Sequence, residues 1–176
     1  MAEEPTRERP RLYLITPPQI SDVAAFVDQY QAAIEGGDIA SLQVRLKTGD
    51  QIDTAATRAV AQAVRPLCDK NDIALFINDS PQLCRALEAD GVHLGANDMD
   101  IAAARELVGP DVIIGATCKN SRHTAMEAGE QGADYVAFGA FYPSQTKDNT
   151  SPADVSVLTW CQMFLTLPCV AIGGVN

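Results

Sequence analysis

The sequence predicts an α/β fold, a (β/α)8 TIM barrel that lacks its last helix, strand and helix. Apolar runs of strand length alternate with segments of helical period along almost the whole chain, which is typical of a parallel sheet. Residues 89–95 (ADGVHLG) and 133–139 (ADYVAFG) form an internal repeat, because both pass from a helix end through a strand into a glycine. The 176 residues hold only seven predicted strands and six helices, whereas a complete barrel needs roughly 200 residues or more.

Each predicted strand is a short apolar run that ends at polar residues or glycine. The strands are expected at 12–16, 41–45, 74–78, 91–94, 112–117, 135–138 and 169–172. The helices between them show the 3.6-residue period and are expected at 22–35, 54–70, 81–88, 101–108, 121–129 and 155–165. Asp100 and Ser121 stand where the N-caps of the fourth and fifth helices are expected.

The composition indicates one globular domain that binds neither membrane nor nucleic acid. Apolar residues make up 47% and charged residues 20%, and the formal charge is −10, without a cluster of Lys and Arg. No run approaches the roughly 20 apolar residues of a membrane span. Residues 1–10 are charged and interrupted by proline, so we expect a flexible leader rather than a secretory signal. We therefore expect a cytoplasmic protein with a single barrel domain over 11–176 that is incomplete at its C-terminal end.

The five cysteines contain no CxxC pair and lie mostly in apolar contexts. This pattern favours buried thiols in a reducing cytoplasm over a metal or redox site. The cysteines are Cys68, Cys84, Cys118, Cys161 and Cys169.

A polar loop at 139–147 (GAFYPSQTK) and the pair Gly173–Gly174 each follow an apolar run that is typical of a buried parallel strand. Glycine lets backbone N–H groups approach an anion closely, and the hydroxyls of Ser144 and Thr146 with Lys147 complete a phosphate cradle. A surface position for Lys147 is the alternative. Because chemistry in α/β barrels takes place at the carboxyl ends of strands, we predict a phosphorylated small molecule as the ligand.

Gln43, Arg45 and Lys47 alternate with Val44 and Leu46 at the end of the second predicted strand. A period of two places the three polar residues on one face. In isolation this pattern is equally typical of a solvated strand edge. In a barrel strand, a basic pair that faces the mouth suits a diphosphate.

Carboxylates follow the third and fourth strands, as Asn78–Asp79 and Asp98. Helix capping is the simpler interpretation of either aspartate alone. Together, two carboxylates from adjacent strand ends can hold Mg²⁺, which typically takes one or two carboxylates, waters and phosphate oxygens. We expect His93 to pack or hydrogen-bond inside the barrel wall, and His123 to face solvent.

Eight short motifs extend these observations along nearly the whole chain, and their order and spacing resemble the thiamine-phosphate synthase family. They are YLIT at 13–16, QxRxK at 43–47, FIND at 76–79, DGVHLGxxD at 90–98, IG at 114–115, GADYVxFG at 132–139, PxxTK at 143–147 and AIGGV at 171–175. No single motif is decisive.

The resemblance implies a Mg²⁺-dependent transferase that joins hydroxymethylpyrimidine diphosphate to thiazole phosphate, releasing pyrophosphate. No strong protein nucleophile is required, because the chemistry resembles an ionisation in which magnesium and the cations Arg45, Lys47 and Lys147 stabilise the leaving group. The implied contacts to the pyrimidine diphosphate are Gln43, Arg45, Lys47, Asn78, Thr117 and Lys147. The implied magnesium ligands are Asp79 and Asp98, and the implied thiazole-phosphate site comprises Ser144, Thr146, Gly173 and Gly174. A homodimer is a further expectation.

Three departures from the family pattern leave alternatives open. Leu46 replaces a usual acidic residue, and Thr117 with Cys118–Lys119 stands where Ser and His are common. The family's eighth strand, whose loop helps to bind the thiazole phosphate, is not found, so two strand edges would be exposed. The alternatives are a regulator that binds thiamine precursors, a thiazole tautomerase, whose expected His lies at Lys119, and an unrelated phosphate-handling barrel such as an aldolase. The presence of both Asp79 and Asp98 favours an enzyme.

Overall fold

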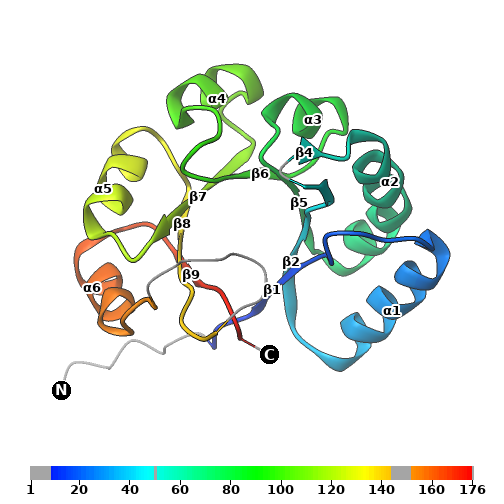
Figure 1. The fold of residues 1–176 in the computed structure, drawn as a ribbon, viewed down its shortest axis with the longest axis horizontal. Helices are drawn as coiled ribbons and strands as arrows, with labels where there is room; N and C mark the ends of the chain where they lie inside the picture. The colour runs from blue at the N-terminus through cyan, green and yellow to red at the C-terminus, as the bar shows by residue number, and fades with distance from the viewer. Residues whose placement is uncertain (1–8, 50, 144–151, 176) are drawn as a thin grey trace.

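The seven predicted strands form one parallel sheet that curls into a nearly closed barrel with the helices on its outside (Figure 1). This computed structural model describes residues 9–49, 51–143 and 152–175; most of the expected leader lies outside them. The strand order is β1-β2-β5-β6-β7-β8-β9, and all neighbours are parallel. The predicted barrel architecture is therefore confirmed, with β1 and β9 at the two ends of the strand order.

All the predicted strands and helices are present, with small shifts at their ends. The strands of the barrel are β1 Leu12–Ile15, β2 Ile39–Val44, β5 Ala74–Asn78, β6 Gly91–Leu94, β7 Ile113–Lys119, β8 Tyr135–Phe138 and β9 Cys169–Ala171. The helices are α1 Val23–Gly36, α2 Thr54–Asn71, α3 Pro81–Ala86, α4 Ile101–Val108, α5 Arg122–Glu130 and α6 Ser156–Phe164. Within the described residues, no helix has the length and apolar character needed to cross a membrane.

The end of the second strand differs from the prediction. β2 stops at Val44, and the chain then forms a short antiparallel hairpin of β3 Lys47–Thr48 and β4 Gln51–Ile52 before α2 begins. Leu46 is buried in the core, and the Lys47 N–H donates to the carbonyl oxygen of Pro18. The prediction that Lys47 shares a strand face with Gln43 was therefore wrong, because the barrel strand ends at Val44 and Lys47 belongs to the hairpin. Two-residue strands carry too little periodicity to be found in a sequence.

Each of the first five helices begins at a side-chain cap. The predicted caps are confirmed: Asp100 Oδ1 accepts from the N–H groups of Ala102 and Ala103, and Ser121 Oγ accepts from the Thr124 N–H. Asp22, Asp53 and Ser80 cap α1, α2 and α3 in the same way. These caps satisfy N–H groups that the helix itself leaves unpaired. The caps therefore set the position at which each loop from a strand end to the next helix stops.

The inside of the barrel is filled by aromatic rings rather than by aliphatic side chains alone. The Tyr135 ring lies 5.9 Å from that of Tyr13 and 5.7 Å from that of Phe76, measured between centroids. Glycines make room for the rings: a Cβ on Gly115 would lie 1.9 Å from the Tyr135 ring, and one on Gly91 would lie 2.2 Å from Phe76. The aliphatic core lies between the sheet and the surrounding helices.

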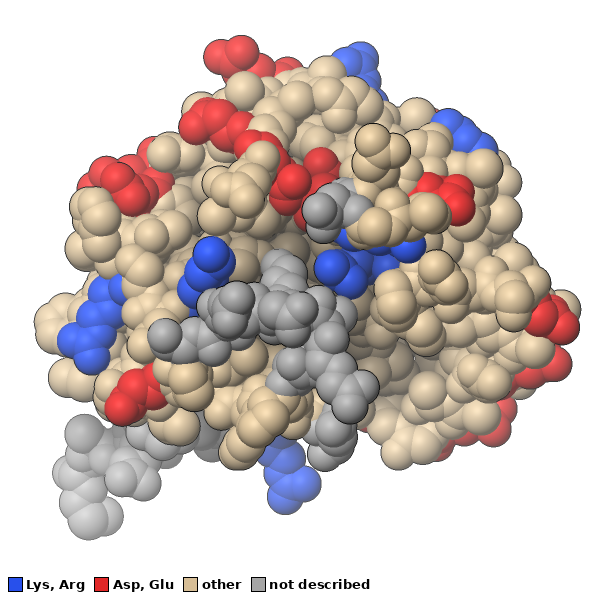
Figure 2. All heavy atoms as spheres, viewed as in Figure 1, with Lys and Arg blue, Asp and Glu red and all other residues tan. Residues whose placement is uncertain are grey.

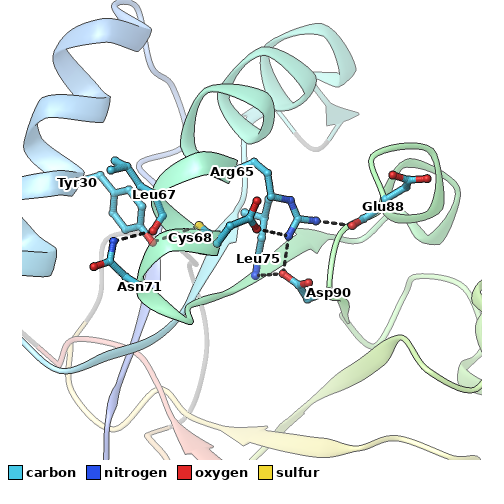
Figure 3. A network of polar contacts seen from close by, with 9 residues as sticks. Tyr30, Arg65, Leu67, Cys68, Asn71, Leu75, Glu88 and Asp90 are labelled. Atoms are coloured by element: carbon cyan, nitrogen blue, oxygen red, sulfur yellow. Dashed lines mark hydrogen bonds and ion pairs between the residues drawn. The ribbon is translucent and has the colours of Figure 1, made fainter.

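The internal repeat found in the sequence has a structural role at the opposite end of the barrel. Asp90 precedes β6, and its carboxylate accepts the Leu75 N–H at 2.7 Å and an Arg65 N–H at 2.9 Å (Figure 3). Arg65, which projects from α2, also donates to the carbonyl oxygen of Glu88 (Figure 3).

The second copy of the repeat makes the same contacts two strands further on. Asp134 precedes β8, and its carboxylate accepts the Ile114 N–H at 2.7 Å and an N–H of Arg105, from α4, at 2.5 Å. In both copies the aspartate carboxylate accepts a backbone N–H near the start of the preceding strand. The same carboxylate forms an ion pair with an arginine from the helix before that strand. The two aspartates of the repeat therefore support the amino-terminal face of the barrel rather than the site.

Candidate active site

The carboxyl ends of the strands open on one face of the molecule, where Lys and Arg side chains flank a central hollow (Figure 2). The loops and strand ends on this face carry the described site residues predicted from the sequence. Ser144, Thr146 and Lys147 lie outside the described residues, so their predicted roles stay predictions. The described residues of the predicted site are Gln43, Arg45, Lys47, Asn78, Asp79, Asp98, Thr117, Gly173 and Gly174.

Lys47, Asp79 and Asp98 meet at the mouth. Lys47 Nζ lies 2.5 Å from Asp79 Oδ2, and both side chains are largely buried, with 20% and 12% exposed. Asp79 also hydrogen-bonds Asp98 through their side chains. The tight turn after β6 presents Asp98, whose Oδ2 accepts the Gly95 N–H at 2.6 Å. Lys47 therefore reaches the site, although it does so from the hairpin and not from β2.

Helix capping does not account for the two aspartates. Ser80 caps α3 and Asp100 caps α4, so neither Asp79 nor Asp98 has that role. Asp79 instead has a φ of 60°, which is uncommon outside glycine, and its N–H donates to the His93 carbonyl oxygen at 2.8 Å. This bond ties the end of β5 to the end of β6 and brings the two carboxylates together.

The electrostatics of the pair are set by burial and by its neighbours. Burial raises the pKa of Asp98, and its hydrogen bond to Asp79 raises it further. Burial also opposes ionisation of Asp79, but hydrogen bonds from Asp98 and Lys47 hold the pKa of Asp79 below its usual value. The two carboxylates therefore differ in acidity, with the pKa of Asp98 raised and that of Asp79 lowered, as expected for like charges in contact.

The carboxylate oxygens of this cluster suit a hard cation that keeps several of its water ligands when it binds to a protein. A divalent ion bound between two carboxylates in contact would offset their mutual repulsion. Among the described residues, no group of three or more His, Cys, Asp or Glu side chains could hold a metal ion by itself. The arrangement thus fits Mg²⁺ with water and ligand oxygens completing its shell, and not a closed structural zinc site.

Asn78 carries an unsatisfied donor beside this cluster. Its side chain is buried at 6% exposure, and Nδ2 has no hydrogen-bond partner among the residues that the structure describes. Leaving a buried donor unpaired costs about 1–3 kcal/mol. A bound ligand that accepts a hydrogen bond from Asn78 Nδ2 would remove this cost. Arg45 directly follows the neighbouring strand β2 and is half-buried, and in the described part of the chain its side chain has no ion-pair partner.

A continuous hydrogen-bonded network crosses the inside of the barrel below the mouth. Gln43 Nε2 donates to the Tyr13 hydroxyl at 3.1 Å, and that hydroxyl lies 2.8 Å from the hydroxyl of Tyr135. Tyr135 in turn contacts His93 Nδ1 at 2.9 Å, while His93 Nε2 contacts the Thr117 hydroxyl at 2.8 Å. Burial raises the pKa of Tyr13 to about 12, so the network is uncharged at that position near neutral pH.

The network contains both confirmed and overlooked residues. The prediction that His93 hydrogen-bonds inside the barrel is confirmed, and His123 is solvent-facing as predicted, with 78% of its side chain exposed. Tyr13 and Tyr135 were not singled out as site residues. The sequence feature that indicates such a role is a tyrosine hydroxyl at an inward-facing position of an otherwise apolar strand.

The glycine turn after β9 lies directly against the start of the predicted phosphate loop. The Tyr142 N–H donates to the Gly173 carbonyl oxygen at 3.1 Å, and the Phe141 N–H donates to that of Ile172 at 3.4 Å. Gly173 and Gly174 have φ values of 93° and 71°. A Cβ on Gly174 would lie 2.7 Å from the Pro143 carbonyl oxygen. The two segments that the sequence associated with phosphate binding are therefore neighbours, as far as the loop is described.

A parallel barrel whose charged and polar side chains meet at the carboxyl ends of its strands has the architecture of a barrel enzyme. The model of the thiamine monophosphate synthase family matches residues 12–176, and the chain belongs to this family.

Known proteins similar to the chain agree with this assignment. The chain is 56% identical over 171 residues to the thiamine-phosphate synthase of Hyphomonas neptunium, with 97% of this chain and 77% of the relative covered. It is 52% identical over 166 residues to that of Rhodospirillum centenum, with 94% and 78% covered. The solved thiamine phosphate pyrophosphorylase from Pyrococcus furiosus is 32% identical and superposes with a TM-score of 0.78, with 94% of this chain and 76% of that chain covered.

Proposed function

We propose that the protein joins hydroxymethylpyrimidine diphosphate to thiazole phosphate, forming thiamine phosphate and releasing pyrophosphate. The observation that carries the proposal is the contact of Lys47 with Asp79, and of Asp79 with Asp98, at the mouth of the barrel. It supplies a cation for a diphosphate and a carboxylate pair for a metal ion within one cluster. Family membership gives the reaction its class.

The pyrimidine diphosphate is assigned to the side of the mouth formed by β2, β5 and β6. Arg45 and Lys47 supply positive charge, and the unpaired Asn78 Nδ2 supplies a buried hydrogen-bond donor. Gln43 and Thr117, at the two ends of the internal network, are proposed to contact the pyrimidine substrate. The network fixes their orientation before the substrate binds, which favours catalysis by positioning.

The thiazole phosphate is assigned to the side formed by β8 and β9. Gly173 and Gly174 expose backbone next to the loop that begins at Gly139, and backbone N–H groups in such turns bind phosphate. Ser144 and Thr146 of that loop are proposed to add hydroxyl donors. Lys147 is proposed to contact the diphosphate.

Asp79 and Asp98 would hold Mg²⁺, which when bound would neutralise charge on the departing diphosphate. The reaction breaks the bond between the pyrimidine methylene carbon and a diphosphate oxygen, and the electron pair leaves with pyrophosphate. The lone pair of the thiazole nitrogen forms the new bond to the same carbon. Arg45 and Lys47 stabilise the developing negative charge, and no protein nucleophile takes part.

Three further expectations accompany this proposal. We propose that residues 11–176 form one barrel domain that lacks its last unit, in line with β1 and β9 each pairing on one side within the described residues. The homodimer and the cytoplasmic location stay predictions.

The proposed reaction is tested by mass-spectrometric detection of thiamine phosphate from the two substrates, with Mg²⁺ and with a chelator. Product that requires both substrates and Mg²⁺ would support the proposal. A folded protein that binds the pyrimidine diphosphate without forming product would instead indicate the regulatory alternative. If the chelator left product formation unchanged, the metal would be removed from the proposal and the proposed transferase activity would stand.

A further inference from the structure

Lys119 occupies an unusual position at the carboxyl end of β7. A bulge in the pairing with β8 lies between Thr117 and Lys119, so that Lys119 stands opposite Phe138. Cys118 is buried against the outer helices, whereas Lys119 is exposed with a φ of 52°. A lysine in this left-handed conformation is strained, and such strain is concentrated at functional sites.

The backbone of Lys119 is tied to the start of the phosphate loop. The Gly139 N–H donates to the Lys119 carbonyl oxygen at 2.9 Å, and the Ile172 N–H donates to Phe138 on the adjacent strand at 2.9 Å. Lys119 therefore lies in the same row of strand ends as Gly139 and the Gly173–Gly174 turn. It is on the opposite side of the mouth from Lys47.

The charge distribution gives Lys119 a role that no other described residue fills on this side. Figure 2 shows basic side chains on both sides of the central hollow, over β2 and β3 and over β7 and β8. Residues 113–121 and 135–143 contain one Lys or Arg, which is Lys119. Within the described ranges its side chain forms no ion pair, whereas Lys47 is paired with Asp79. An exposed, unpaired cation beside a glycine turn is available to an anionic ligand.

We propose that Lys119 binds the phosphate group of the thiazole substrate, together with the backbone of the Gly173–Gly174 turn. This inference rests on the proposed function, since it assigns a residue to one of its two substrates. The net charge of −10 makes such a local cation important, because the protein as a whole repels a phosphate. Lys119 thereby distinguishes the phosphorylated thiazole from its alcohol, and contributes to specificity rather than to bond breaking.

The test compares the affinities of variants for the thiazole phosphate and for the dephosphorylated thiazole alcohol, measured by calorimetry. Lys119→Asn is the informative variant, because Asn tolerates the left-handed conformation and the protein should fold. We expect its affinity for the thiazole phosphate to fall about tenfold, the size of one charge-assisted contact at an exposed site. Its affinity for the alcohol should be unchanged, and Lys119→Arg should retain most of the phosphate affinity. Lys70→Asn removes an exposed lysine of α2 as the matched control.

Each other outcome is decisive. Unchanged affinity of Lys119→Asn for the thiazole phosphate, or an equal loss of affinity for the phosphate and the alcohol, would overturn the inference. The proposed function would still stand if the wild-type protein forms product. A loss confined to the pyrimidine diphosphate would overturn the assignment to the thiazole side. Failure of the wild-type protein to bind either substrate would overturn the proposed function and the inference together.

Discussion

The Tyr135 hydroxyl lies 2.9 Å from His93 Nδ1 inside the barrel, and the two rings stack with their centroids 5.7 Å apart. Through this contact, residues on opposite sides of the barrel are linked: Gln43 through Tyr13 at one end, and Thr117 at the other. The two substrate contacts proposed on β2 and β7 are therefore parts of one network, and a change at its centre should affect both.

Tyr135→Phe should lower kcat about tenfold, because removing the hydroxyl frees His93 to reorient and loosens the hold on Thr117 and Gln43. It should also lower the free energy of unfolding by about 1–3 kcal/mol, since buried partners lose a hydrogen bond. Kinetics and urea denaturation measure the two effects. Tyr30→Phe is the matched control, because it removes only a 3.4 Å contact with Cys68 in the outer layer. Equal kcat values for the two variants would contradict a positioning role for the network.

Asp79→Asn should lower kcat/KM by about 10²–10³-fold, which corresponds to roughly 3–4 kcal/mol of transition-state stabilisation. The variant keeps the size of the side chain and removes the charge that pairs with Lys47 and would ligate Mg²⁺. Its Mg²⁺ dependence should shift to higher concentrations. Asp72→Asn is the matched control, because Asp72 has a φ of 54°, close to the 60° of Asp79, and caps α2 away from the mouth. Full activity in Asp79→Asn would remove this carboxylate from the site.

Gly174→Ala should raise KM for the thiazole phosphate more than KM for the pyrimidine diphosphate. An added Cβ would lie 2.7 Å from the Pro143 carbonyl oxygen and from Tyr142 Cβ, so the glycine turn and the loop must separate. Gly109→Ala separates this effect from backbone strain, because Gly109 has a φ of 88° and nothing within 4 Å of its added Cβ. Both variants should lose stability, and only Gly174→Ala should change KM. Equal effects on the two KM values would contradict the assignment.

The buried thiols should make the protein less stable at alkaline pH. Burial raises the pKa of Cys118 to about 12, from a usual value of 9.0. Between these values the native state keeps a proton that the unfolded state has lost, so the free energy of unfolding falls as pH rises, by about 1.4 kcal/mol per pH unit for each such thiol. Denaturation at a series of pH values should show a smaller slope for Cys118→Ala than for Cys169→Ala, which removes a half-buried thiol. Identical slopes would show that Cys118 does not couple to stability.

The sequence indicated most of the barrel because its information is periodic and local. Alternating apolar runs and helical segments located each strand of the barrel, and Asp100 and Ser121 were recognised as caps because a cap is defined within four residues. The resemblance between 89–95 and 133–139 was also visible, but its meaning was not. That Asp90 and Asp134 pair with Arg65 and Arg105 depends on packing between helices and strands.

The sequence by itself determined the fold class, the family resemblance and the identity of the charged residues that gather at the mouth. The tertiary structure decided how they act. Lys47 reaches Asp79 from a hairpin that no periodicity predicts, and Tyr13 meets Tyr135 across 122 positions of the chain. Period and motif describe neighbours along the chain, whereas hydrogen bonds and charge pairs depend on distance in space. That distance is set only when the strands close around the barrel and bring their carboxyl ends together.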